Sequence, residues 1–119
     1  MRKSNKILPK GVEGQILNTL YQLLADLKNP KEAKLFLEEI LTPTELIIFA
    51  KRLAAACYLA EGATYQKIKD NLGLSSATIA GIEQNLKKSA GFALALKKIE
   101  AEKWASAWAG KIEGFFKKK

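Results

Sequence analysis

The sequence predicts an all-helical protein, and three observations support this fold class. Alanine, leucine, lysine and glutamate are abundant while valine occurs once, a composition that favours helices over strands. Apolar residues recur at spacings of three and four along most of the chain, which is the period of an amphipathic helix. Several segments also begin with residues that cap helix N-termini. A length of 119 residues fits one domain.

Residues 1–10, MRKSNKILPK, are expected to form a basic flexible arm before a single helical domain over residues 11–119. The first helix of that domain is predicted from Val12 to near Asn29. Its apolar positions share the helical spacing and are Ile16, Leu17, Leu20, Leu23, Leu24 and Leu27.

The second helix is predicted to begin at Pro30. Asn29 is a good N-cap, proline suits the first helical position, and Glu32 stands at the third. The stripe expected to be buried consists of Leu35, Phe36 and Ile40.

The stretch LTPTEL contains the clearest helix start in the chain. Thr42 is the N-cap and Glu45 its reciprocal partner in a capping box, while Leu41 and Leu46 stand where a hydrophobic staple needs them. The helix that follows is apolar on nearly every side and ends at Gly62. Because a helix of this kind is surrounded by protein, we expect a second subunit to cover part of it.

Residues 64–88 have the spacing of a helix-turn-helix. Thr64 caps a short helix, Gly73 marks the turn, and the second helix begins near Ser75 or Ser76. The residues expected to face inward are Ile68, Leu72, Leu74, Ile79, Ile82 and Leu86. In such a motif the second helix enters the major groove of DNA. On spacing alone, a pair of helices without any nucleic-acid function fits equally well.

The segment from Gly91 to Lys119 is also predicted to be helical, with Trp104 and Trp108 one turn apart on an apolar face. A basic amphipathic helix that binds a membrane surface is one interpretation of this segment. A helix in the core of a dimer is the other, and we favour it because apolar core stripes are far more common.

The formal net charge is +8, and it lies mainly toward the two ends of the chain. Residues 1–28 carry a net charge of +3, residues 29–63 of −1, residues 64–88 of +2 and residues 89–119 of +4. Such a distribution attracts polyanions, nucleic acid before acidic membrane, although solubility alone also explains it.

The residue types argue against an enzyme. With no histidine and only Cys57, the chain has no recognisable zinc site, no paired nucleophile and base, and no internal disulfide. No phosphate-binding loop or cofactor motif is present. Met1–Lys10 lacks the apolar run of a signal peptide, and no segment has the length of apolar residues needed to span a membrane, so a cytoplasmic protein is expected.

The stretches LTPTE, AKRLAAACYLAEG and TYQKIKDNLGLSSATI resemble the Trp repressor superfamily, and most closely its YerC-like branch of small bacterial proteins. The resemblance covers about residues 17–88. It implies an intertwined homodimer with six helices per chain, in which each chain presents one DNA-reading head. The two recognition helices would then lie about 34 Å apart, one turn of DNA.

The resemblance and the spacing together predict a regulator of transcription that binds double-stranded DNA in a sequence-specific, repressor-like manner. The alternative is a helical module that binds a protein or membrane and has lost operator reading. The residues predicted to contact DNA lie on the outer faces of the two helices and are Gln66, Lys67, Lys69, Ser75, Ser76, Ala77, Thr78, Ala80, Gly81 and Gln84. Hydroxyls and lysines suit phosphates, alanines suit thymine methyl groups, and glutamine suits adenine.

Members of the family that sense tryptophan hold it between two arginines. One of these matches Arg52, but the other position is Gly81 in this chain. A glycine cannot stack on an indole ring, so we predict no tight binding of tryptophan. Arg52 is therefore either a residue of an effector site or, as we favour, a helix arginine that pairs with Glu45 or with a partner chain.

Overall fold

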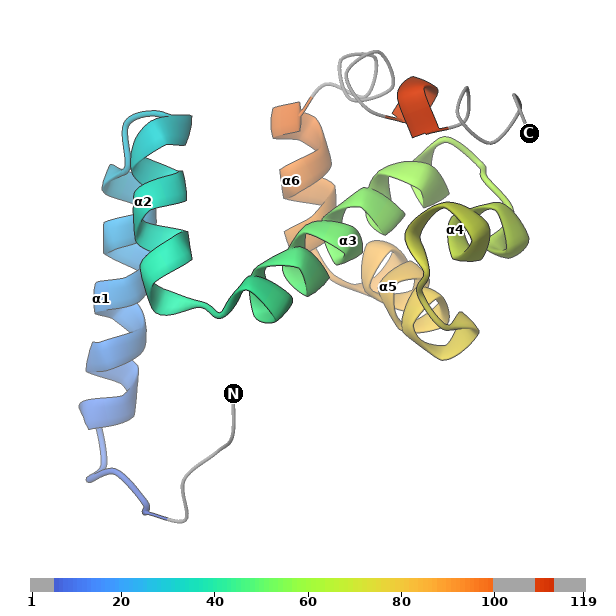
Figure 1. The fold of residues 1–119 in the computed structure, drawn as a ribbon. Helices are drawn as coiled ribbons and strands as arrows, with labels where there is room; N and C mark the ends of the chain where they lie inside the picture. The colour runs from blue at the N-terminus through green and yellow to red at the C-terminus, as the bar shows by residue number, and fades with distance from the viewer. Residues whose placement is uncertain (1–5, 100–108, 113–119) are drawn as a thin grey trace. The chain divides into compact units, whose positions relative to one another are not determined.

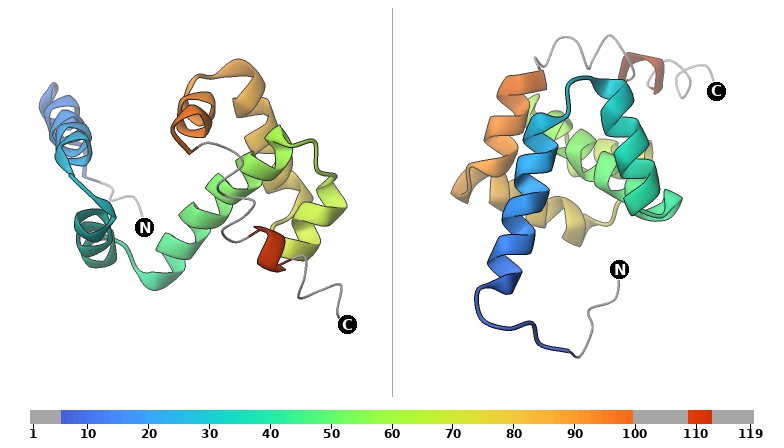
Figure 2. Two further views of the ribbon diagram at one scale, coloured as in Figure 1. Left: turned by 90° about the horizontal axis from the view of Figure 1, so that it is seen from above. Right: turned by 90° about the vertical axis from the view of Figure 1, so that its left-hand side faces the viewer.

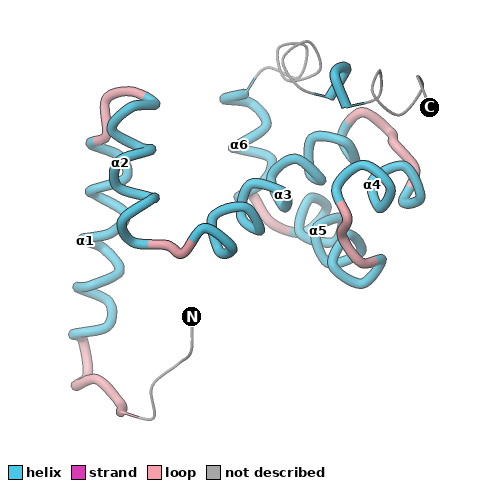
Figure 3. The backbone as a smooth tube through the Cα atoms, in the orientation of Figure 1, coloured by secondary structure: helices cyan, strands magenta, loops and turns pink. Residues whose placement is uncertain are grey.

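The computed structural model describes residues 6–99 and 109–112, and all regular elements in this part of the chain are helices (Figure 3). In chain order they are α1 (Val12–Asp26), α2 (Pro30–Ile40), α3 (Pro43–Ala60), α4 (Tyr65–Leu72), α5 (Ser76–Lys88) and α6 (Gly91–Ile99), and residues 109–112 form a further helical turn. The predicted all-helical class is thus confirmed. None of the helices described is long and apolar enough to cross a membrane.

The chain divides into two compact units, Met1–Ile47 and Ile48–Lys119, with the boundary inside α3. In the first unit α1 and α2 run antiparallel beside each other (Figures 1 and 2). No residue of these two helices is buried. Two helices alone offer each other one narrow face, so most of their apolar side chains remain in contact with solvent.

The stripe predicted to be buried on α2 is therefore largely exposed in a single chain. Leu35 is 63% exposed and Ile40 is 52% exposed, while Phe36 is half-buried. The prediction of burial was wrong for this chain by itself, because the spacing shows which side chains share a face but not what covers that face.

Local capping explains where α2 and α3 begin. The Asn29 side chain accepts a hydrogen bond from the Glu32 amide at 2.9 Å. At the start of α3 the Glu45 carboxylate accepts from the Thr42 amide at 2.8 Å, and the Thr42 hydroxyl accepts from the Glu45 amide at 3.1 Å. This is the predicted capping box, which satisfies two amides that have no partner within the helix.

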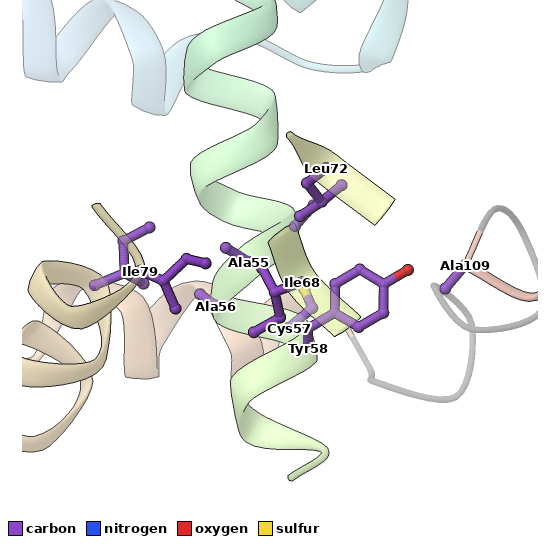
Figure 4. Close-up of a cluster of buried hydrophobic side chains, with 10 residues drawn as sticks. Ala55, Ala56, Cys57, Tyr58, Ile68, Leu72, Ile79 and Ala109 are labelled. Atoms are coloured by element: carbon purple, nitrogen blue, oxygen red, sulfur yellow. The ribbon is translucent and has the colours of Figure 1, made fainter. Parts of the chain in front are cut away.

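The second unit is built around α3. Its residues Ala54–Tyr58 are all buried, and α4 and α5 pack against this stretch (Figures 1 and 4). The other buried members of this core are Ile68, Leu72, Ile79, Ile82 and Ala109. Partly buried side chains of α6, among them Phe92 and Leu96, pack against the same core. The predicted helix over Gly91–Lys119 is observed at Gly91–Ile99 and residues 109–112, and the remainder, with Trp104 and Trp108, lies outside the described residues.

Candidate nucleic-acid interface

The helix-turn-helix is held by a core of small side chains on one helix and branched side chains on two others. Ala55 and Ala56 of α3 are completely buried, as are Ile68 of α4 and Ile79 of α5. Figure 4 shows Ile79 on one side of α3 and Leu72 on the other. Because alanine carries a single methyl group, α4 and α5 approach the backbone of α3 closely, and their positions in the unit are fixed by this packing.

The turn between α4 and α5 depends on Gly73. Its φ of 68° lies in the left-handed region, where a β-carbon is unfavourable, and its amide donates to the Lys69 carbonyl at 2.8 Å to end α4. Leu74 packs partly buried against the core. The predicted turn residue and the predicted apolar residue beside it are both confirmed.

Two side-chain hydrogen bonds join the helices around this turn. The Asn71 amide donates to the Tyr58 hydroxyl at 2.9 Å, linking α4 to α3. The Tyr65 hydroxyl donates to the Glu83 carboxylate at 2.7 Å, linking the start of α4 to the middle of α5. This bond to Glu83, assisted by burial and by the negative charge of Glu83, raises the pKa of Tyr65 above its ordinary value. Tyr65 therefore remains a hydrogen-bond donor at neutral pH.

The N-terminus of α5 is capped from within. The Ser75 hydroxyl accepts from the Thr78 amide at 3.1 Å and donates to the Thr78 hydroxyl at 3.0 Å. The Ser75 and Thr78 side chains are thus bonded to each other. The Ser76 hydroxyl makes no hydrogen bond within the described structure. The first backbone amides of a helix point outward and have no partner inside it, so they add donors to the same surface.

The outer face of α5 is short-chained and uncharged over its first three turns. Ser76, Ala77, Gly81 and Gln84 are exposed, whereas Thr78 and Ala80 are half-buried. A β-carbon added at Gly81 would meet no atom within 4 Å. The structure therefore brings the predicted α5 residues onto one surface, with Thr78 and Ala80 toward its edges.

The predicted residues of α4 flank that surface. Gln66, Lys67 and Lys69 are exposed. The Gln66 amide donates to the Asp70 carboxylate one turn later at 2.8 Å. Gln66 is thus partly engaged within its own helix, and the two lysines carry the positive charge of this edge.

The chain is similar in sequence to a known protein family and to a known protein. The family model described as Trp repressor protein matches residues 15–100. The uncharacterized protein YerC of Bacillus subtilis is 35% identical over 75 residues, which cover 63% of this chain and 72% of YerC. The chain belongs to the Trp repressor family.

Solved structures agree with this assignment. A TrpR-like protein from Eubacterium eligens superposes with a TM-score of 0.69 at 27% identity, covering 76% of this chain and 95% of that one. A candidate Trp repressor from Staphylococcus aureus superposes with a TM-score of 0.70 at 24% identity, covering 81% and 97%. The predicted Trp-repressor-like fold with its helix-turn-helix is thereby confirmed, and membership of this family points to a regulator rather than an enzyme.

One of our interpretations was that Arg52 pairs with Glu45. The described residues of this Trp repressor family member show no such pair. Arg52 is exposed and makes no hydrogen bond or ion pair within the described residues. The Glu45 carboxylate accepts a hydrogen bond from the Thr42 amide at the start of α3. An effector site and a partner chain therefore remain as the two interpretations of Arg52.

Cys57 is a core residue. It is 2% exposed, and burial, with the Glu61 charge as a second cause, raises the pKa of its thiol. The thiol is therefore protonated and inert at neutral pH.

A shallow groove of about 400 Å³ lies beside the helix-turn-helix in the second unit. It is lined mainly by apolar atoms, and the lining residues are Leu53, Asn85, Ser89, Gly91, Phe92 and Ala95. The groove does not include Arg52 or Gly81, the two positions at which the family's tryptophan site was expected.

Sequence reasoning missed the residues that orient the two helices. Tyr58 and Asn71 are 13 positions apart, and Tyr65 and Glu83 are 18 positions apart, so no local pattern connects them. The only available signal was that polar groups stood next to apolar core positions, where each needs a hydrogen-bond partner.

Proposed function

We propose that this chain is a sequence-specific DNA-binding transcriptional regulator that works as a homodimer and inserts α5 into the major groove. One observation carries the proposal. The first turns of α5 expose small polar and apolar side chains, while Ile79 and Ile82 on the opposite side are buried and hold the helix. Membership of the Trp repressor family supports the same function.

The exposed residues suit distinct parts of a duplex. The ammonium groups of Lys67 and Lys69 on α4 would contact phosphates on the edge of the groove. Ser76 and the free amides at the start of α5 would donate to phosphates or base edges. Ala77 would touch thymine methyl groups, and Gln84 would reach adenine. Most of the affinity would then come from phosphates, and a modest part from bases.

Exposed apolar surface supports the homodimer. The large apolar side chains that remain exposed on α1 are Ile16, Leu17, Tyr21, Leu23 and Leu24. On α3 they are Ile47, Ile48, Phe49 and Leu53. Single chains rarely leave so many large apolar side chains in solvent, so a second copy is the simplest cover for them. A dimer would also place two heads one DNA turn apart.

Selection of bound sequences from random DNA duplexes, repeated at two salt concentrations, tests this function. We expect an enriched palindrome, and an affinity that falls steeply with salt because each neutralised phosphate releases counterions. Retention of DNA without enrichment would contradict sequence-specific reading. No retention at low salt would contradict DNA binding itself.

A matched pair of variants locates the surface. Ala77→Glu adds a negative charge at the start of α5 and should abolish retention of the selected duplex, because the negatively charged DNA would repel a carboxylate on the helix that enters its major groove. Gln15→Glu adds the same charge to the exposed surface of α1 and should leave retention nearly unchanged. Equal losses in both variants would place the DNA-binding surface elsewhere.

We also propose that tryptophan is not a corepressor of this chain, since Gly81 offers no side chain to stack on an indole ring. Titration calorimetry with the purified protein should show no binding at micromolar tryptophan. Binding in that range would overturn this proposal without affecting the one for DNA.

A further inference from the structure

Lys51 belongs to α3, outside the helix-turn-helix, yet its ammonium group lies at the turn of that motif. A β-carbon added at Gly73 would be 3.8 Å from the Lys51 Nζ. The charged end of Lys51 therefore lies close to Gly73, the residue that ends α4.

The position of Lys51 on its helix explains why it points there. Ala54 and Ala55 follow it by three and four residues, and both are buried against the helix-turn-helix. Residues three and four apart share one face of a helix, so Lys51 continues the face of α3 that packs on α4 and α5. Its half-buried side chain fits a stem that lies along protein and an ammonium group that reaches solvent.

The Lys51 ammonium group is chemically uncommitted. It makes no hydrogen bond or ion pair within the described residues. An ammonium group is a compact point charge with three donors, which suits a phosphate oxygen better than the patterned edge of a base. It also lies beside Gly73, the residue that ends α4, and the exposed Ser75 and Ser76 follow Gly73 by two and three positions in the chain.

We propose that Lys51 is a phosphate-contacting residue of the DNA interface, supplied from α3 to the strand that passes the turn. This proposal rests on the DNA-binding function proposed above. It extends the binding surface beyond the two helices of the motif. It also predicts that α3 contributes to affinity but not to sequence preference, because phosphates are the same at every base pair.

The competing role for Lys51 is structural. The ammonium group lies near the C-terminal end of α4, where the helix dipole is negative and a cation stabilises the helix. In that role the lysine would raise the stability of the fold and leave the contacts with DNA unchanged. The structural role would change the unfolding midpoint, whereas the phosphate contact would change the affinity for DNA.

The test compares Lys51→Gln with Lys31→Gln, which removes an exposed lysine from α2, and with Lys51→Arg, which keeps the charge. Affinities for two duplexes of different sequence are measured by fluorescence anisotropy at several salt concentrations, and the unfolding midpoint is measured for each variant. We expect Lys51→Gln to reduce the slope of log affinity against log salt by about 0.9 for each chain bound, which is about an eightfold loss of affinity per chain at 0.1 M salt. Lys51→Arg should restore the slope, and Lys31→Gln should not change it.

Several results would overturn the assignment. A slope unchanged by Lys51→Gln would exclude a phosphate contact. If the slope is unchanged and the unfolding midpoint of this variant is lowered, Lys51 has the structural role. A loss confined to some sequences would show base reading instead. If the unmodified protein does not bind duplex DNA at low salt, the proposed function fails together with this inference. If the unmodified protein binds DNA but Lys51→Gln has the same slope, the inference about Lys51 fails and the proposed function stands.

Discussion

Tyr65 connects the two helices of the DNA-binding motif through a single hydrogen bond to Glu83. The Tyr65→Phe substitution removes the hydroxyl donor and leaves the half-buried Glu83 carboxylate without this partner. We expect a lower unfolding midpoint and weaker binding of the selected duplex, because α5 is then less firmly oriented. Tyr21→Phe removes a hydroxyl that makes no hydrogen bond in the described part of the chain, so it should change neither quantity. Equal behaviour of the two variants would show that the bond does not orient α5.

The raised pKa of Tyr65 makes stability depend on alkaline pH. The unfolded chain loses this proton near pH 10.0, the ordinary value, whereas the folded chain loses it only at higher pH. The stabilisation is therefore fully present below pH 10.0 and disappears as the pH rises through the pKa of the folded state. Free energies of unfolding between about pH 8 and pH 11 should fall more steeply for the unmodified protein than for Tyr65→Phe. The two proteins share every other titratable group, so the difference between the two curves isolates Tyr65.

At the scale of single helices, the start of α5 has its own cap, which can be removed. Ser75→Ala deletes the acceptor of the Thr78 amide, and such losses cost about 1 kcal/mol. We expect the free energy of unfolding in urea to fall by that amount. Binding of DNA should weaken as well, because the first turn of α5 would fray where it meets the groove. Ser89→Ala changes the residue after α5, whose side chain caps no amide in the described structure, and should have little effect on stability.

Helix starts were the part of the fold most accessible from sequence, because each is determined by neighbouring residues. The caps at Asn29, Thr42 and Thr64 were predicted, and the structure confirms them. The start of α5 was predicted near Ser75 or Ser76, and the structure begins the helix at Ser76 with Ser75 as its cap. The end of α1 was predicted less well. It was expected near Asn29 but occurs at Asp26, because Pro30 keeps the residue before it extended and Asn29 already serves as the cap of α2.

Contacts between helices were much less predictable. The inward residues of the motif followed from their spacing, and Ile68, Leu72, Ile79 and Ile82 are indeed buried. The spacing could not show that Tyr65 meets Glu83, because that contact depends on the angle at which α4 and α5 cross. For the same reason it could not show that the Lys51 ammonium lies beside Gly73.

For the whole molecule, the exposed apolar side chains predict that the protein has the mass of a dimer in solution. We expect the unmodified protein to sediment at twice the 13.1 kDa of one chain. Leu35→Lys places a charge on a side chain that is 63% exposed in one chain and that a partner would cover, so it should shift the protein toward monomers. Lys34→Gln, at the neighbouring exposed position, should leave the mass unchanged. A monomeric unmodified protein at tens of micromolar would refute the homodimer.

The open space at Gly81 bears on how proteins of this design diverge. On α5 the residues that the fold requires, such as Ile79 and Ile82, are separate from the exposed positions of Ala77, Gly81 and Gln84. A β-carbon at position 81 would meet no atom within 4 Å, so a side chain can start there without a clash. Helical alanine is even about 1 kcal/mol more favourable than glycine there. If α5 reads DNA as proposed, single substitutions at these exposed positions would change the target site while the residues that hold the fold stay intact.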